Sequence, residues 1–139
     1  MNATSTDPAF LFRTLAQTAP VSEPANVKPL MRMEDVVDYI GDDPATQRIV
    51  FHLCLDLIIT SLPRLRQAVD SGDIPTLKQL AHHTRGSLSM LGLPSLRELG
   101  EQIEYHYDDL GAECWRQRCE ALYKLLTQLS IELQEHLAA

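Results

Sequence analysis

The chain has 139 residues, of which 45% are apolar and 22% are charged, and its formal net charge is −7. This size and composition predict one folded helical domain. The negative charge argues against nucleic-acid partners, because a phosphate backbone would repel it. No apolar run reaches the roughly 20 residues of a membrane-spanning helix, and no signal peptide is visible. We therefore expect a cytoplasmic protein without direct membrane contact.

The three cysteines, Cys54, Cys114 and Cys119, show no CxxC spacing. They fit reduced thiols better than a disulfide framework or a zinc site.

Residues 1 to 30 differ in composition from the rest of the chain. Four of the eight prolines lie there, namely Pro8, Pro20, Pro24 and Pro29. This composition predicts a flexible linker or tail, with one short helical turn at residues 10 to 15 as an alternative within it. The segment resembles an interdomain linker, and the folded domain is expected to span residues 31 to 139.

The remainder predicts helices joined by short turns. A short amphipathic segment runs from Leu30 to Ile40. Asp43 is typical of an N-cap and Pro44 of the first helical position, so a second helix is expected from there to about Asp70.

Apolar residues of this second helix recur at helical spacing, and Pro63 is expected to kink or divide it. The predicted buried stripe comprises Ile49, Val50, Leu53, Cys54, Leu57, Ile58, Ser61, Leu62 and Leu65.

Asp73 is expected to cap a third helix that ends near Gly92, and a fourth helix begins around Pro94. A turn is expected at residues 108 to 111. The last helix presents apolar residues at alternating intervals of four and three, namely Trp115, Cys119, Leu122, Leu126, Leu129, Leu133 and Leu137. Short connections make neighbouring helices antiparallel. The sequence therefore predicts an all-α fold, an up-down antiparallel four-helix bundle with a short leading helix.

The third helix carries His82 on the side opposite its apolar face. The expected core residues are Leu77, Leu80, Ala81, Thr84, Leu88 and Leu91. Lys78 and Arg85 flank His82 by one turn on either side and form a positive patch suited to a phosphoryl group. Gly86 leaves the space beside the ring empty, despite the cost of about 1 kcal/mol for glycine in a helix. The alternative is an ordinary surface histidine beside a helix flaw.

The other histidines carry no such pattern. His83 lies about 100° around the helix from His82, so the two rings diverge too far to chelate one metal. We expect His83 to be a packing or boundary residue rather than a second acceptor. His52, His106 and His136 are scattered and are assigned to structure or solvent. No metal site is expected.

Several of these residues keep the register of a known signature. The matching positions are Ala81-His82-x-x-Arg85-Gly86-Ser87, Gly92-Leu93, Leu96-x-x-Leu99 and Ile103-Glu104. This pattern resembles histidine-containing phosphotransfer (HPt) domains over residues 31 to 137. It is most similar to those at the C-terminus of tripartite hybrid sensor kinases of the anaerobic-respiration-control type.

The resemblance implies a role for each matching residue. His82 accepts a phosphoryl group from a receiver-domain aspartate and passes it to another receiver. Arg85 stands where the family usually has lysine and steadies the phosphoryl oxygens, with a different geometry. Gly86 gives access to the ring, and Ser87 is its small neighbour.

Two further positions and one surface follow from the same resemblance. Gly92 ends the helix or allows close packing, and Glu104 hydrogen-bonds near the histidine and selects its tautomer. Receivers usually dock beside the histidine, partly on the leading helix. The apolar side chains of the leading helix either all pack in the core or form an exposed docking patch. They are Met31, Met33, Val36, Val37 and Ile40.

We therefore expect a phosphorelay module without ATP-dependent kinase activity and without a cofactor, since no ATP-binding motif is present. Its partners are receiver domains, in the same chain or separate, and the isolated domain is expected to be a monomer. The alternative is an HPt-like bundle that only binds or scaffolds a receiver. A metal- or cofactor-binding bundle enzyme would need inward Glu-x-x-His pairs, which the predicted core faces lack.

Overall fold

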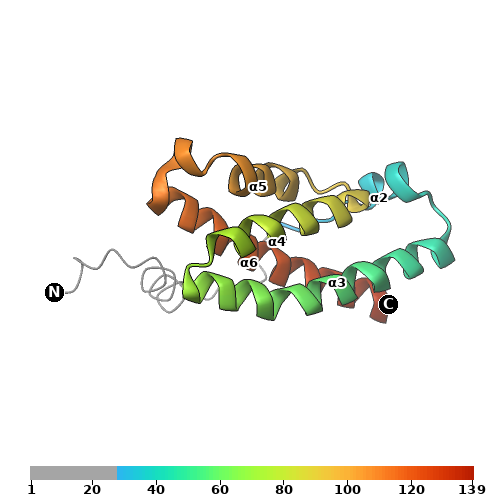
Figure 1. The fold of residues 1–139 in the computed structure, drawn as a ribbon. Coiled ribbons are helices and arrows are strands. Elements are labelled where there is room, and N and C mark those ends of the chain that lie inside the picture. Colours follow the sequence, from blue (N-terminus) through green and yellow to red (C-terminus); the bar gives the residue numbers. More distant parts are fainter. Residues whose placement is uncertain (1–27) are drawn as a thin grey trace.

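The computed structural model describes residues 28–139, and this part of the chain contains helices and no strand. The elements are α2 (Met33–Ile40), α3 (Pro44–Ser71), α4 (Ile74–Ser87), the 3-10 helix η2 (Ser89–Leu91), α5 (Pro94–Tyr105) and α6 (Tyr107–Ala138). The four long helices lie side by side, and α2 lies at the end of the bundle next to η2 (Figure 1). The predicted all-α bundle with a short leading helix is confirmed. The linker predicted for residues 1 to 30, with its possible turn at 10 to 15, lies outside the described residues up to position 27.

Helices α3 and α4 each begin at a side-chain cap. Asp43 accepts hydrogen bonds from the backbone N–H of Thr46 at 3.1 Å and from its hydroxyl at 2.7 Å. Asp73 makes the same pair of bonds with Thr76, at 3.3 and 2.7 Å. These carboxylates satisfy N–H groups that have no partner inside the helix. Both predicted caps are confirmed, and they fix where α3 and α4 start.

The core lies between the four long helices and is almost entirely apolar. α3 packs against α4 and α6, and α5 packs against the same two helices. All six residues expected on the inner face of the third helix are buried. Trp115 of α6 is 1% exposed, and its indole N–H donates to the Ile103 carbonyl at 2.9 Å, which joins α6 to α5.

The stripe predicted on α3 is partly wrong. Ile49 is 62% exposed and Leu53 is 64% exposed, whereas Phe51, outside the predicted stripe, is 4% exposed. The reason is geometric: α3 has 28 residues and α4 has 14, so α4 can cover only part of the length of α3. Pro63 does not divide α3, which continues from Pro44 to Ser71, and Pro63 itself is exposed.

Two predicted boundaries also differ. The third helix ends as an α-helix at Ser87, and η2 continues the chain to Gly92. The turn expected at residues 108 to 111 is instead helical over its first three positions. Gly111, with φ of 78° and ψ of 161°, interrupts the helical backbone of α6 there. A glycine adopts this positive φ without the strain that a side chain would bring.

The segment before α2 is anchored to α6 by Glu132. The Leu30 backbone N–H donates to both oxygens of this carboxylate, at 3.0 and 2.8 Å, and the Met31 N–H donates at 2.9 Å. Glu132 is 6% exposed, so its charge needs such partners. The chain is therefore held against α6 just before it enters α2 (Figure 1).

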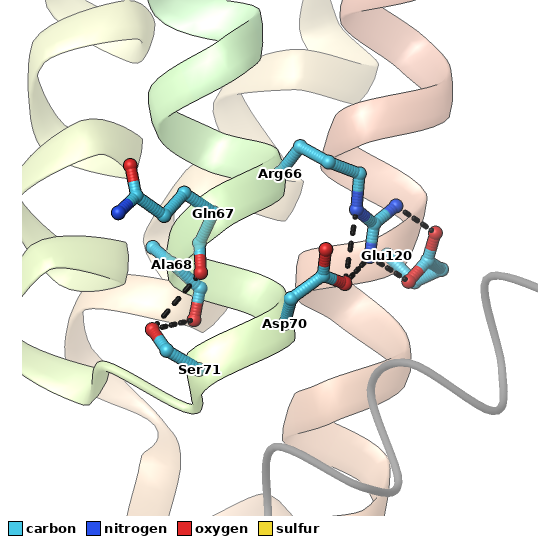
Figure 2. A network of polar contacts seen from close by, with 6 residues as sticks. All are labelled: Arg66, Gln67, Ala68, Asp70, Ser71 and Glu120. Atoms are coloured by element: carbon cyan, nitrogen blue, oxygen red, sulfur yellow. Dashed lines mark hydrogen bonds and ion pairs between the residues drawn. The ribbon is translucent and has the colours of Figure 1, made fainter.

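An arginine on α3 joins this helix to α6. Figure 2 shows Arg66 between Asp70 of its own helix and Glu120 of α6. Its Nη1 and Nη2 atoms lie 3.0 and 3.2 Å from the two Glu120 oxygens, and Nη2 lies 3.1 Å from Asp70. The guanidinium also covers the Tyr123 ring at 4.9 Å. Burial alone acts to lower the pKa of Arg66, but the Glu120 and Asp70 contacts outweigh it and raise it.

Candidate functional site

The side chain of His82 is 69% exposed on the outer face of α4. It lies there because the opposite face of the helix is fully used by the core. Leu77, Leu80, Ala81 and Thr84 are each no more than 2% exposed. The predicted exposure of His82 is confirmed, so its ring is open to a partner from solvent.

Glu104 of α5 joins His82 to Arg85. Its Oε1 atom lies 2.7 Å from His82 Nδ1, and its Oε2 atom lies 2.7 Å from Arg85 Nε and 2.6 Å from Arg85 Nη2. The Glu104 side chain is only 7% exposed, so this carboxylate is shielded from water by its two partners. A nearly buried carboxylate therefore bridges an exposed imidazole and a guanidinium.

This contact fixes the orientation of the imidazole. An ionised carboxylate can only accept hydrogen bonds, so the proton must sit on His82 Nδ1. In the neutral ring, Nε2 then carries a lone pair and no proton. Because Nδ1 is held toward Glu104, Nε2 is the ring atom left for an incoming electrophile.

Arg85 is directed to Glu104. Its side chain is 24% exposed, and the hydrogen bond with Glu104 raises the pKa of its guanidinium. The group stays positively charged and contributes a fixed charge close to His82. The structure thus brings Arg85, His82 and Glu104 together. The Glu104–His82 contact was expected from the family resemblance, whereas the Glu104–Arg85 contact was not predicted.

Lys78 contacts a different part of the molecule. Its ammonium lies 5.5 Å from the centre of the Tyr107 ring on α6. The sequence placed Lys78 in a positive patch with Arg85, but in the structure each of the two has a partner of its own. The positive patch that the helix spacing predicts beside His82 is therefore weaker, because Arg85 is paired with Glu104 and Lys78 lies over Tyr107.

The surface beside His82 is open at Gly86. This residue is exposed, and a Cβ atom added there would meet nothing within 4 Å. No packing inside the described bundle therefore requires glycine at this position. A small cleft of about 260 Å³ adjoins it. The cleft is lined by Tyr39, Arg85, Gly86, Ser89, Leu93, Leu96 and Arg97. Ser87 is half-buried as the last residue of α4.

Gly92 follows η2 in the chain and packs against α2. It has a φ of +75°, and a Cβ atom added there would lie 2.8 Å from Asp35 Cβ and 3.1 Å from Tyr39 Cε2. Glycine is required on both counts, since a side chain would be strained and would collide with α2. Gly92 both ends η2 and allows close packing, which brings α2 next to the cleft.

Apolar side chains of α2 are divided between core and solvent. Met31 before the helix and Val36 within it are buried, whereas Met33 is 38% exposed and Val37 is 40% exposed. Ile40 is half-buried. The two alternatives left open by the sequence, core or exposed patch, are therefore both realised.

Sequence reasoning missed three exposed apolar side chains on the elements that carry or adjoin the site. Tyr39 of α2, Met90 of η2 and Tyr105 of α5 are 56%, 39% and 66% exposed. Tyr105 directly follows Glu104, so its position was readable once Glu104 was singled out. Tyr39 and Met90 depend on how α2 and η2 pack, which no local pattern specifies.

The structure also places the other four histidines and two of the cysteines. His83 and His52 are exposed, and His106 Nδ1 lies 2.9 Å from Asp109. The His136 ring lies 5.7 Å from the Phe51 ring, tilted by 56°. Burial raises the pKa of Cys54 to about 11 and also raises that of Cys119, so neither thiol is readily ionised.

Between positions 28 and 139, no group of three or more His, Cys, Asp or Glu residues is placed to hold a metal ion. In the same range, no helix is long and apolar enough to cross a membrane.

Comparison with known proteins gives one match. The family model of the Hpt domain matches residues 32–137. Comparisons with curated proteins and with solved structures gave no match.

Proposed function

Because the chain belongs to the Hpt domain family, we propose that it is a phosphorelay intermediate whose phosphoryl acceptor is His82. The phosphoryl group comes from an aspartate of one receiver domain and passes to an aspartate of another. Membership in the family implies phosphotransfer within a phosphorelay, and the residue that carries the group is our assignment. The alternative from the sequence, a bundle that only binds a receiver, shares the fold but needs no nucleophile.

A single observation carries this assignment, namely the 2.7 Å contact between Glu104 and Nδ1 of an imidazole that is 69% exposed. In the transfer step, the Nε2 lone pair attacks phosphorus in line with the leaving oxygen. The bond between phosphorus and the aspartyl oxygen breaks, and its electron pair leaves with the receiver carboxylate. The ring becomes a phosphorylated imidazolium that keeps its Nδ1 proton, and Glu104 neutralises the new positive charge.

Arg85 supports this step in two ways. It holds Glu104 in place, and it supplies positive charge to the phosphoryl oxygens. A guanidinium has five N–H donors, so binding Glu104 through Nε and Nη2 leaves the Nη1 donors for phosphoryl oxygens. Acyl phosphates and phosphoimidazoles are both energy-rich, so the same geometry serves transfer in either direction.

The receiver would dock over the open surface at Gly86 and the neighbouring apolar side chains. Val37, Tyr39 and Met90 are exposed on α2 and η2, and Gly92 holds α2 against the end of the histidine helix. Gly86 has no packing role of its own in the described bundle, which supports a use in contacts with a partner. The receiver brings the acidic pocket that carries its aspartate.

The wider setting that we propose follows the sequence resemblance. The motif register is most similar to the C-terminal domain of tripartite hybrid sensor kinases, and the proline-rich residues 1 to 30 are typical of an interdomain linker. We place the domain in the cytoplasm as a monomer that receivers contact in turn. Phosphotransfer from a panel of purified receivers, with the molar mass of the domain measured by light scattering, tests this setting.

Incubation with phosphorylated receivers tests the acceptor directly. Wild-type protein should gain acid-labile, alkali-stable phosphate, and His82→Gln should gain none. His83→Gln is the matched control, because His83 is the adjacent exposed histidine, and it should accept phosphate as the wild type does. Acid-labile phosphate on His82→Gln would overturn the assignment. Receiver binding without any phosphate on the wild type would favour the binding-only bundle.

A further inference from the structure

Gly100 of α5 lies against the side chain of Arg85 on α4. A Cβ atom added at Gly100 would lie 2.9 Å from Arg85 Cδ, 3.0 Å from Arg85 Cβ and 3.3 Å from Arg85 Cγ. These are the three nearest atoms, and two of the distances are at or below the shortest that real Cβ atoms tolerate. The aliphatic part of Arg85 therefore occupies the space that a side chain at position 100 would fill.

Backbone geometry gives no other reason for this glycine. Gly100 is buried inside a regular helix, and it is not among the four glycines of the described residues that have a positive φ. Glycine in a helix interior is less favourable than alanine, because it loses more backbone freedom on folding. In the described structure, the missing side chain at Gly100 leaves room for the side chain of Arg85.

That course determines where the guanidinium ends. Gly100 lies four residues before Glu104, so both face the same side of α5. Arg85 leaves α4, crosses α5 over Gly100 and reaches Glu104 Oε2 at 2.7 Å through Nε. The other oxygen of that carboxylate holds His82 Nδ1. A displacement of Arg85 at Gly100 is therefore passed to His82 through one carboxylate.

We infer that Gly100 is a positioning residue for His82, because its missing side chain lets Arg85 bind and orient the carboxylate that holds the imidazole. The inference rests on the proposed function for its importance in phosphoryl transfer. The Arg85–Glu104–His82 contact chain on which it acts exists without any partner. Gly100 touches no phosphoryl group, and its effect travels entirely through Arg85.

The test compares Gly100→Ala with the wild type by NMR and by transfer from a phosphorylated receiver. In Gly100→Ala, the Arg85 Nε–H signal should move toward the position of a solvent-exposed arginine. The ¹⁵N shifts of the His82 ring should report a smaller share of the tautomer protonated on Nδ1. The initial transfer rate should fall about tenfold, as expected when one charge-assisted hydrogen bond is lost. Gly86→Ala is the matched control for the NMR signal of Arg85, which it should leave in place, because its Cβ meets nothing.

A double variant shows whether Gly100 acts through Arg85. In an Arg85→Ala background, Gly100→Ala should change neither the His82 tautomer nor the transfer rate any further. An equal additional slowing in that background would overturn the inference, and so would an unmoved Arg85 signal in Gly100→Ala. If Gly100→Ala does not fold, Arg85→Gly in the same chain should restore folding, because it removes all three contacting atoms, and failure to restore it would contradict the inference.

The two proposals fail in different ways. If the wild type accepts no phosphate but Gly100→Ala still shifts the Arg85 signal and the His82 tautomer, the positioning inference stands and the proposed function is wrong. If the wild type accepts phosphate but neither NMR signal changes in Gly100→Ala, the positioning inference is wrong and the proposed function stands.

Discussion

In the described part of the chain, Arg66–Glu120 and Arg85–Glu104 are arginine–glutamate pairs that join neighbouring helices, and they are nearly identical in burial. Arg66 and Arg85 are each 24% exposed, and their partners Glu120 and Glu104 are 9% and 7% exposed. One pair joins α3 to α6 and the other joins α4 to α5. By charge, burial and contact distance alone, nothing would assign a structural role to one and a functional role to the other.

The difference lies in how each carboxylate uses its two oxygens. Both oxygens of Glu120 face Arg66, which also binds Asp70 and covers Tyr123, so this network is closed on itself (Figure 2). Glu104 instead gives one oxygen to Arg85 and the other to the exposed His82. On the proposed function, the second partner of the carboxylate distinguishes the two pairs, because Glu104 also binds an imidazole that is 69% exposed.

Removing the glutamate of the functional pair should have the largest effect. Glu104→Ala loses the bond that fixes the His82 tautomer and leaves Arg85 without its carboxylate. The transfer rate from a phosphorylated receiver should fall about 100-fold, equivalent to ~2.7 kcal/mol. Rapid-quench measurement of phosphotransfer checks this. Glu104→Gln keeps an acceptor for Nδ1–H and should lose less. A Glu104→Ala rate within twofold of the wild type would remove the distinction between the two pairs.

The same substitution in the closed pair should affect stability and leave transfer unchanged. Glu120→Ala leaves Arg66 without its interhelical carboxylate and should lower the free energy of unfolding by about 2 kcal/mol. This is less than the ~3–5 kcal/mol of a fully buried pair, because Arg66 is partly exposed. Urea unfolding followed by Trp115 fluorescence measures it. A transfer rate that falls as far as in Glu104→Ala would show that the α3–α6 pair also serves the site.

Lys78 offers the smallest and most specific test. Because its ammonium lies over the Tyr107 ring, Lys78→Ala should lower the free energy of unfolding by about 0.5 kcal/mol and leave the transfer rate within twofold of the wild type. Phosphotransfer and urea unfolding of the same variant check both values. Tenfold slower transfer would show that Lys78 contributes to a positive patch at His82, as the helix spacing predicted.

Sequence patterns predicted the fold and the face of the histidine well. The core face of α4 follows from a helical period in one helix, so the exposure of His82 needed no knowledge of its neighbours. The pattern failed on α3, where Ile49 and Leu53 are exposed. Which residues of a helix are buried depends on how far the neighbouring helix extends along it, and the period of one helix does not give that length.

Contacts between helices were less accessible to sequence reasoning. The pairing of Glu104 with His82 was expected only through the family resemblance, since 22 residues separate them in sequence. The partner of Lys78 and the role of Gly100 depend on the distance between particular helices. Gly100 had a readable signal, because it is a glycine inside an apolar helical pattern, but its neighbour Arg85 becomes evident only when α4 is packed on α5.

The position of phosphate on the imidazole tests the central claim most directly. In the proposed mechanism, Glu104 keeps the proton on Nδ1 of His82 and leaves Nε2 as the nucleophile. Protein with ¹⁵N-labelled histidine, phosphorylated by a receiver, should show ³¹P–¹⁵N coupling to Nε2 of His82 and a protonated Nδ1. Coupling to Nδ1, or to a ring other than His82, would contradict the account.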